Sequence, residues 1–197
     1  QTLSFGQVMV LQSDSIDMAN ALNRLSGSLT GTGVLQKTGV GLIELTGANP
    51  YVGTTKILGG VLRASIGSGI PTDSFLEFGG GALETSGSFT RPLGLFGQAF
   101  RAIGGLGFSA YGGSLSVNVG GAGQTLVTQA GTPFDVTTLV LGDLSSNYPT
   151  SFLNPIDLNG RTLTIRSEAA GAEMFGALTG NNNSNLVKWG GGNLSLR

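Results

Sequence analysis

Cysteine and histidine are both absent from the 197-residue sequence. The first absence excludes disulfides and thiolate metal sites, and the second removes the commonest general base and metal ligand. Only 11% of the residues are charged, less than half of the usual share of about a quarter. The formal net charge is −1, so the chain has no basic field to hold nucleic acid or anionic lipid. We therefore expect no metal, cofactor or nucleic acid as ligand, and we assign no catalytic, cofactor-binding or metal-binding residues.

Long hydrophobic runs are missing as well. The most apolar stretch, 92–111, is interrupted by Gln98, Arg101 and repeated glycine, so no segment has the pattern of a membrane span or a signal peptide. If the protein is exported, we expect its signal to have been removed or to lie outside this chain. Arg197 falls within a repeat, which is typical of a boundary made by proteolysis or truncation.

Glycine is abundant, with 35 of 197 residues, more than twice the average usage of roughly 7%. It has no G-X-Y period, which excludes a collagen triple helix. Hydrophobic residues make up 40% of the chain, enough for a sizeable core, so the low charge does not indicate disorder. Serine, threonine and asparagine fill the polar positions instead. The length is compatible with a single domain over 1–197.

The two ends of the chain repeat one another. At a constant separation of 151 positions, Leu35, Lys37, Gly39, Gly41, Ile43 and Leu45 align with Leu186, Lys188, Gly190, Gly192, Leu194 and Leu196. The segment 1–5 (QTLSF) also resembles 161–165 (RTLTI). Self-similarity indicates stacked repeats, in which no unit buries its apolar face alone. The sequence therefore predicts one window of a longer periodic object, with repeat-like blocks at 29–64 and 178–197.

Short apolar stretches alternate with turn residues along the whole chain. Most stretches are four or five residues long and alternate apolar with polar positions, which is typical of strands. Only Ser15–Leu25 has helical spacing, and the alternative for this segment is a strand and a loop. The predicted strands are Thr2–Phe5, Val8–Leu11, Val34–Lys37, Leu42–Leu45, Thr55–Leu58, Val61–Ala64, Phe75–Phe78, Ala82–Thr85, Gly107–Ala110, Leu115–Val119, Thr125–Thr128, Thr138–Leu141, Ile156–Leu158, Thr162–Arg166, Asn185–Lys188 and Leu194–Leu196.

Many short strands without intervening helices leave three architectures: an antiparallel sandwich, a closed barrel and a parallel β-solenoid. Asn-Gly and Asp-Gly hairpin turns are scarce, and strands meet instead at single Gly or Gly-x-Gly corners, which suit a chain that turns without reversing. Stacking at about 4.8 Å also favours small polar ladders over like charges. We therefore predict an all-β fold, a right-handed parallel β-helix of roughly eight or nine coils. Its inward residues are predicted to be Leu35, Ile43, Leu45, Leu62, Leu83, Leu115, Val117, Leu139, Leu163 and Leu194.

The run 29–64 resembles the autotransporter-associated β-strand repeat, which is found in passenger regions of bacterial surface and secreted proteins. The positions that fill its pattern are Lys37, Gly39, Gly41, Ile43, Leu45, Gly47, Asn49, Tyr51, Gly53, Thr54, Gly60 and Leu62, with Val34 as a minor departure. The block 89–121 is similar to the stretch that follows such repeats, and 185–196 opens another repeat. The resemblance implies a β-helix at the surface of a bacterium and supplies no catalytic motif.

Several residues have both a functional and a structural interpretation. Lys37 and Lys188 recur at equivalent positions, and an outward lysine that keeps an edge soluble is favoured over a ligand-binding one. The run Asn181–Asn183 with Asn185 suits tight corners better than glycan binding. Trp189 and Tyr51 are expected to pack rather than to form a sugar platform.

Acidic residues supply the two remaining candidates. Asp157, with Asn159 and Gly160, resembles part of a calcium loop, but the other oxygen ligands are missing. A polysaccharide-cleaving β-helix needs two carboxylates about 5 to 9 Å apart, and Asp135 and Asp157 could stack on adjacent coils in this way. With only 11 acidic residues and dispersed cations, we favour a protein without catalysis. The alternative is a β-helix that binds or cleaves polysaccharide.

The sequence thus predicts an extracellular β-solenoid segment of a bacterial surface or secreted protein. Its role would be that of a stalk, an adhesin passenger or a self-assembling filament subunit. The expected partners are copies of the chain joined end to end by strand stacking, or covalent neighbouring repeats, and possible further ligands are host or surface glycans.

Overall fold

The structure is a computed structural model that describes residues 1–14, 24–121 and 123–197. In these residues the chain forms strands and no helix. The strands are β1 (Thr2–Phe5), β2 (Met9–Gln12), β3 (Arg24–Leu25), β4 (Ser28–Gly31), β5 (Leu35–Thr38), β6 (Leu42–Leu45), β7 (Thr55–Ile57), β8 (Val61–Ala64), β9 (Leu76–Phe78), β10 (Ala82–Phe89), β11 (Phe100–Val117), β12 (Leu126–Val127), β13 (Phe134–Leu141), β14 (Thr150–Phe152), β15 (Ile156–Asp157), β16 (Thr162–Arg166), β17 (Ala172–Met174), β18 (Leu178–Thr179), β19 (Asn185–Trp189) and β20 (Leu194–Leu196).

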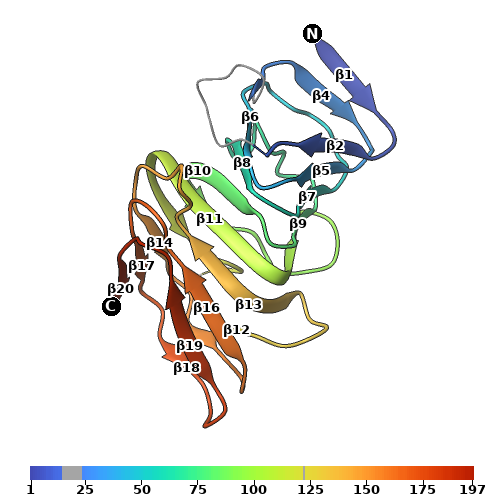
Figure 1. The fold of residues 1–197 in the computed structure, drawn as a ribbon. Coiled ribbons are helices and arrows are strands. Elements are labelled where there is room, and N and C mark those ends of the chain that lie inside the picture. The colour runs from blue at the N-terminus through green and yellow to red at the C-terminus, as the bar shows by residue number, and fades with distance from the viewer. Residues whose placement is uncertain (15–23, 122) are drawn as a thin grey trace.

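Strand pairing in the described residues is parallel between all named strands. An isolated antiparallel bridge joins Ala110 to Tyr148. Each strand pairs with the equivalent strand of the next coil, and one ladder of eight described strands runs β2-β5-β7-β9-β11-β13-β16-β19. The predicted parallel β-helix is therefore confirmed, and the sandwich and barrel alternatives are wrong. The first and last strands lie at opposite ends of the stack (Figure 1).

Further ladders form the other sides of the coils. The series β3-β6-β8-β10 joins the first ladder at β11, and β14-β17-β20 extends from the end of β11. Two smaller sheets, β1-β4 and β12-β15-β18, complete the coils at either end of the stack. The long strand β11 crosses the middle of the molecule (Figure 1) and connects these ladders.

Strand β11 passes through two glycine bends where two separate strands were predicted. Its start pairs with β9, its middle with β10 and its end with β14. Between these regions the chain has positive φ at Gly104 (77°) and Gly112 (76°), a conformation that glycine adopts without steric cost. Strands β3, β4, β14, β17 and β18 were not predicted, and most are short. The segment Ser15–Leu25, for which a helix was weighed against a strand and a loop, is mostly outside the described residues, but Arg24–Leu25 is strand.

The inside of the solenoid is a continuous apolar core. Nine of the ten residues predicted to point inward are buried, and the tenth, Leu194, is partly buried against the core on the last strand. Four phenylalanines, two from each of two successive coils, stack at its centre, with ring centroids 4.7–6.0 Å apart and tilted or edge-to-face geometry, namely Phe78, Phe89, Phe100 and Phe108. Such aromatic pairs stabilise the fold beyond their area burial.

Asparagines at two corners join neighbouring coils. The buried Asn49 accepts a hydrogen bond from Leu29 N at 2.9 Å through Oδ1 and donates through Nδ2 to Gly69 O at 2.9 Å. Its amide therefore connects the coil before it to the coil after it. Asn154 plays a similar part, accepting from Val119 N at 2.6 Å and donating to Val119 O at 2.8 Å. These contacts satisfy backbone groups that the corners leave out of the strand ladders.

The sequence repeat corresponds only in part to a structural repeat. The modules 35–45 and 186–196 both fold as strand, glycine corner and strand, and in both a corner glycine donates to a serine carbonyl of the preceding coil, Gly41 to Ser13 (2.7 Å) and Gly192 to Ser167 (2.9 Å). Their second strands lie on different ladders, since β6 pairs with β8 and β20 pairs with β17. The similarity of 1–5 to 161–165 has no such counterpart, because among the described strands β1 pairs with β4 alone, outside the sheet that contains β16.

Candidate functional site

A ladder of alternating charges runs along the outside of β3, β6, β8 and β10. Arg24 pairs in register with Glu44, Glu44 with Arg63, and Arg63 with Glu84. Adjacent strands lie about 4.8 Å apart, so each charge has opposite charges as its neighbours. We expected stacking to remove charges from the ladders, and at these positions the chain instead alternates their sign.

The ion pair of Arg63 and Glu84 is the most buried member of this ladder. Arg63 Nε lies 2.5 Å from Glu84 Oε2, and the two side chains are 7% and 0% exposed. The other carboxylate oxygen of Glu84 accepts hydrogen bonds from Ser109 Oγ (3.0 Å) and Ser145 Oγ (2.6 Å). Because both carboxylate oxygens have partners, the cost of burying the charge is offset.

Tyr111 covers the guanidinium of Arg63. The Cζ atom of Arg63 lies 3.3 Å from the centre of the tyrosine ring, which places the cation against the ring face in a cation–π contact. Tyr111 remains 38% exposed. Glu84 on one side and the ring on the other therefore fix the position of the guanidinium.

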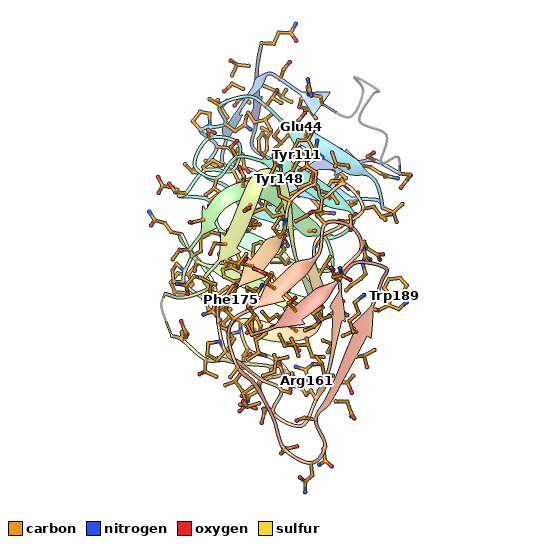
Figure 2. All side chains as sticks on the ribbon, turned by 90° about the vertical axis from the view of Figure 1, so that its left-hand side faces the viewer. Glu44, Tyr111, Tyr148, Arg161, Phe175 and Trp189 are labelled. Atoms are coloured by element: carbon orange, nitrogen blue, oxygen red, sulfur yellow. The ribbon has the colours of Figure 1, made fainter. Side chains whose placement is uncertain are left out.

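A cavity of about 250 Å³ opens beside this pair. Its walls come from β6, β8, β10, β11 and the residues that follow the first two of these strands, so that it crosses four coils. Charged and hydroxyl groups dominate the lining, which includes Glu44, Thr46, Arg63, Ser65, Ser86 and Tyr111. Figure 2 shows Glu44, Tyr111 and Tyr148 in succession along this side of the solenoid.

The loop 142–148 closes the ladder towards the C-terminal coils. Ser145 reaches Glu84, and the backbone N–H of Asp143 donates to Ser109 Oγ at 3.2 Å. Asn147 Oδ1 accepts from Gly112 N at 3.2 Å, which fixes the far end of the loop to β11. The loop therefore covers Glu84, whereas Glu44 and Tyr111 remain at the surface.

A second ladder of charges lies on a different side of the coils. Glu77 contacts Lys56 at 3.5 Å and Arg101 at 2.7 Å. The two cations are about one third exposed, and pairs of this kind contribute little stability. Nearer the C-terminus, Arg161 pairs with Asp135 at 2.9 Å.

The interpretation of Lys37 as an exposed edge residue is wrong. Its side chain is fully buried, and Nζ donates to the carbonyls of Thr38 (2.6 Å), Gly39 (3.1 Å) and Gly59 (3.1 Å), the last of which belongs to the next coil. Burial lowers the pKa of this amine to about 8, and the nearby Asp14 carboxylate partly counteracts the effect. Lys37 is a structural cap of a corner. Lys188 is exposed, as expected, and donates to Gly190 O.

The two aromatic candidates have different environments. Tyr51 is buried, and its hydroxyl shares a hydrogen bond of 2.6 Å with Thr55 Oγ1. Burial raises the pKa of Tyr51 to about 12. This confirms the prediction that Tyr51 packs. The same prediction is wrong for Trp189, which is 59% exposed on the last long strand, with the Arg166 guanidinium 5.7 Å from its ring.

The asparagine run and the Asp157 loop both form tight turns. Asn181 Oδ1 accepts from Asn183 N at 3.0 Å, and Asn181 N donates to Ser184 Oγ at 3.0 Å. Asp157 Oδ1 accepts from Asn159 N at 2.9 Å, and Asn159 has φ of 47°. Hydrogen bonds from a side chain to the backbone two residues on are typical of Asx turns. These contacts support the structural interpretation of both segments.

Asp135 and Asp157 do not stack as a carboxylate pair. Asp135 is in register with Ile103, and Asp157 with Val127 and Thr179. A backbone hydrogen bond from Gly131 lowers the pKa of Asp135, and Arg161 adds to this effect. In the described residues, no three acidic side chains come together in a group able to hold a metal ion, and no helix is long and apolar enough to cross a membrane.

The sequence analysis missed Arg63, Glu84 and Tyr111. A signal was present for the first two, because Arg24, Glu44, Arg63 and Glu84 recur 19 to 21 positions apart, about one coil. No such signal identifies Tyr111, because its place beside Arg63 depends on the bends of β11.

Comparison with known proteins gives a partial similarity to an adhesin. Over 63 residues the chain is 43% identical to the adhesin BmaC autotransporter of Brucella suis biovar 1 (strain 1330). The match covers 32% of this chain, which spans about 2% of the length of that protein. No protein-family model matches the chain, and no solved structure matches it. The chain is thus a β-solenoid with a local similarity to an autotransporter adhesin, in loose agreement with the resemblance of residues 29–64 to an autotransporter repeat.

Proposed function

We propose that the chain is an adhesive β-solenoid segment of a bacterial surface or secreted protein. The observation that carries the proposal is the 63-residue similarity to an autotransporter adhesin in a chain that folds as a parallel solenoid. Two features of the fold support it. A continuous core gives an extended, rigid surface, and the outward ladders present charged and hydroxyl side chains at regular spacing along it.

An adhesion assay with coated beads tests this proposal. Fluorescent beads carrying the folded chain are expected to adhere to epithelial cells or to immobilised extracellular-matrix glycoproteins more than beads coated with albumin. Free folded chain should compete, and free chain unfolded by heat should not. Adherence at the albumin level on every surface would contradict an adhesive role.

We further propose that the segment is not an enzyme. Three acidic side chains have structural partners: Glu84 is held by Arg63 and two serine hydroxyls, Asp135 by Arg161, and Asp157 by the turn at Asn159. The alternative is cleavage of polysaccharide, for which the cavity beside Glu44 is the best candidate site. Incubation with soluble polysaccharides and measurement of new reducing ends distinguishes the two, because a glycosidase releases them and a binding protein does not.

A further inference from the structure

Arg63 presents hydrogen-bond donors to the cavity from a fixed position. Its side chain is 93% buried, since only 7% is exposed, and Nε is engaged by Glu84. Within the described residues no hydrogen bond is made by its two terminal nitrogens, and the side chain borders the cavity. Their N–H groups form a planar fork. Because Glu84 and Tyr111 hold the guanidinium, a ligand would bind to this fork at a low cost in side-chain entropy.

Glu44 supplies an acceptor on the same wall. Its Oε2 accepts from Arg24 Nε at 2.6 Å, and within the described residues Oε1 makes no hydrogen bond. Ser65, which follows β8, and Ser86, which lies on β10, also line the cavity and bear hydroxyl groups. A fork of donors facing a carboxylate acceptor complements a pair of neighbouring hydroxyl groups, which can accept from one side and donate to the other.

The charge of the cavity favours a neutral ligand. Arg63 is neutralised by Glu84, and Glu44 by Arg24. Glu44 and Glu84 both line the cavity, so an anionic ligand would meet like charge there. A hydrocarbon ligand would bury the free donors of Arg63 without acceptors, which is costly. A neutral polyhydroxylated molecule avoids both costs, and a cavity of about 250 Å³ is slightly smaller than the usual pocket for a drug-sized ligand.

We propose that this cavity is a subsite for one neutral sugar residue of a glycan. Arg63 donates to two neighbouring hydroxyls of the sugar, Glu44 accepts from one of them, and Tyr111 forms the wall that holds Arg63 in place. The proposal gives the adhesive function proposed above a ligand class, and in that sense it rests on that function.

The first test is binding of the 197-residue chain to an array of neutral oligosaccharides built from hexoses, deoxyhexoses and N-acetylhexosamines, with their sialylated and sulfated counterparts. At least one neutral glycan is expected to bind, and its sialylated or sulfated form to bind more weakly. The binder is then titrated by NMR, where the backbone signals of Glu44, Arg63 and Tyr111 should shift. Absence of binding to every neutral glycan, or a preference for the anionic forms, overturns the proposal.

Two matched pairs of variants locate the site. Tyr111→Ala is compared with Tyr148→Ala, because Tyr148 has a similar exposure of 41% and lies outside the cavity. Glu44→Gln is compared with Glu173→Gln, because each glutamate pairs at 2.6 Å with an arginine that is 56% exposed. We expect affinity to fall about tenfold or more in the cavity variants, equivalent to about 1.4 kcal/mol, and less than twofold in the controls. Equal losses within either pair overturn the assignment to this cavity.

Circular dichroism and thermal unfolding of all four variants separate a loss of binding from a loss of fold. The bead assay separates the subsite from the adhesive function. If the beads adhere but the chain binds no glycan on the array, the adhesive function stands and the subsite is wrong. The opposite outcome is a chain that binds a glycan and loses this binding in Tyr111→Ala, while beads coated with the chain do not adhere. That outcome supports the subsite and contradicts the adhesive role.

Discussion

Lys37 Nζ donates to Gly59 O across neighbouring coils at 3.1 Å, while the other two acceptors of this amine belong to its own corner. A lysine is thereby used as an interior cap for backbone carbonyls. Lys188, at the matching position of the second repeat, is exposed. Lys37 and Lys188 therefore allow the effect of burying a lysine to be measured at the same position of one sequence motif.

Lys37→Ala is expected to destabilise the fold by about 1–3 kcal/mol, because it leaves buried carbonyls without donors. Lys188→Ala is the matched control and should stay within about 0.5 kcal/mol of the parent, as for most exposed substitutions. Denaturant midpoints of the two variants give the comparison. Equal midpoints for both would show that the buried position of Lys37 has been misjudged.

The pH dependence of stability should show the buried amine. The pKa of Lys37 is lowered to about 8 in the folded chain, from 10.5, so between these values the unfolded state binds more protons than the folded state. The free energy of unfolding then rises with pH. From about pH 10 the Tyr51 hydroxyl opposes this rise, since its pKa is raised to about 12 and the unfolded state loses its proton first. Urea titrations from pH 7 to 10 measure the slope, which should be smaller in Lys37→Met.

Breaking the buried ion pair should be far more damaging than breaking the exposed one. Arg63→Met leaves the Glu84 carboxylate buried without its cation, which costs about 3–5 kcal/mol. Arg24→Met removes the partner of Glu44, but Arg24 is 56% exposed, so the cost should stay below about 1 kcal/mol. Thermal unfolding of the two variants decides, and similar losses would argue against the burial of Glu84.

Replacing a core leucine by alanine should destabilise the fold more in the inner coils than in the last one. Leu45→Ala and Leu163→Ala should each cost about 2–5 kcal/mol, because both side chains are buried. Leu194 packs against the core only in part, so its replacement by alanine should cost less. Chemical unfolding of the three variants measures the loss in free energy of unfolding for each. A larger loss for Leu194→Ala than for the other two would contradict this prediction.

The chain is expected to associate at its terminal strands. Within the described chain, β19 pairs on one side only and is exposed along its length, and an unpaired strand edge favours pairing with another chain. Light scattering should show mass rising with concentration. Val187→Lys on β19 should reduce the rise, and Val40→Lys, at an exposed corner, should not. A stable monomer at high concentration contradicts this prediction.

The sequence contained enough to predict the architecture, because alternation in short strands and glycine corners are local properties. It also contained the signal for Lys37: Leu35 was placed inside, and the residue two positions on shares its face in a strand. The general preference of lysine for solvent outweighed that signal in our interpretation. Tyr111 is a different case. It reaches Arg63 from a coil 48 positions away in sequence, and the register between them depends on an irregularity in the pairing of β10 with β11.

The charges alternate in sign along the ladder of Arg24, Glu44, Arg63 and Glu84. Insertion or deletion of a single coil within the ladder therefore brings like charges together. Excision of the coil that contains β6 would place Arg24 beside Arg63, and duplication of it would place Glu44 beside a copy of itself. Removal or insertion of two adjacent coils keeps unlike charges in contact. Between β3 and β10, recombination therefore preserves the ladder when coils are lost or gained in even numbers, and a homologue with one coil more or fewer there is expected also to have exchanged a charged residue.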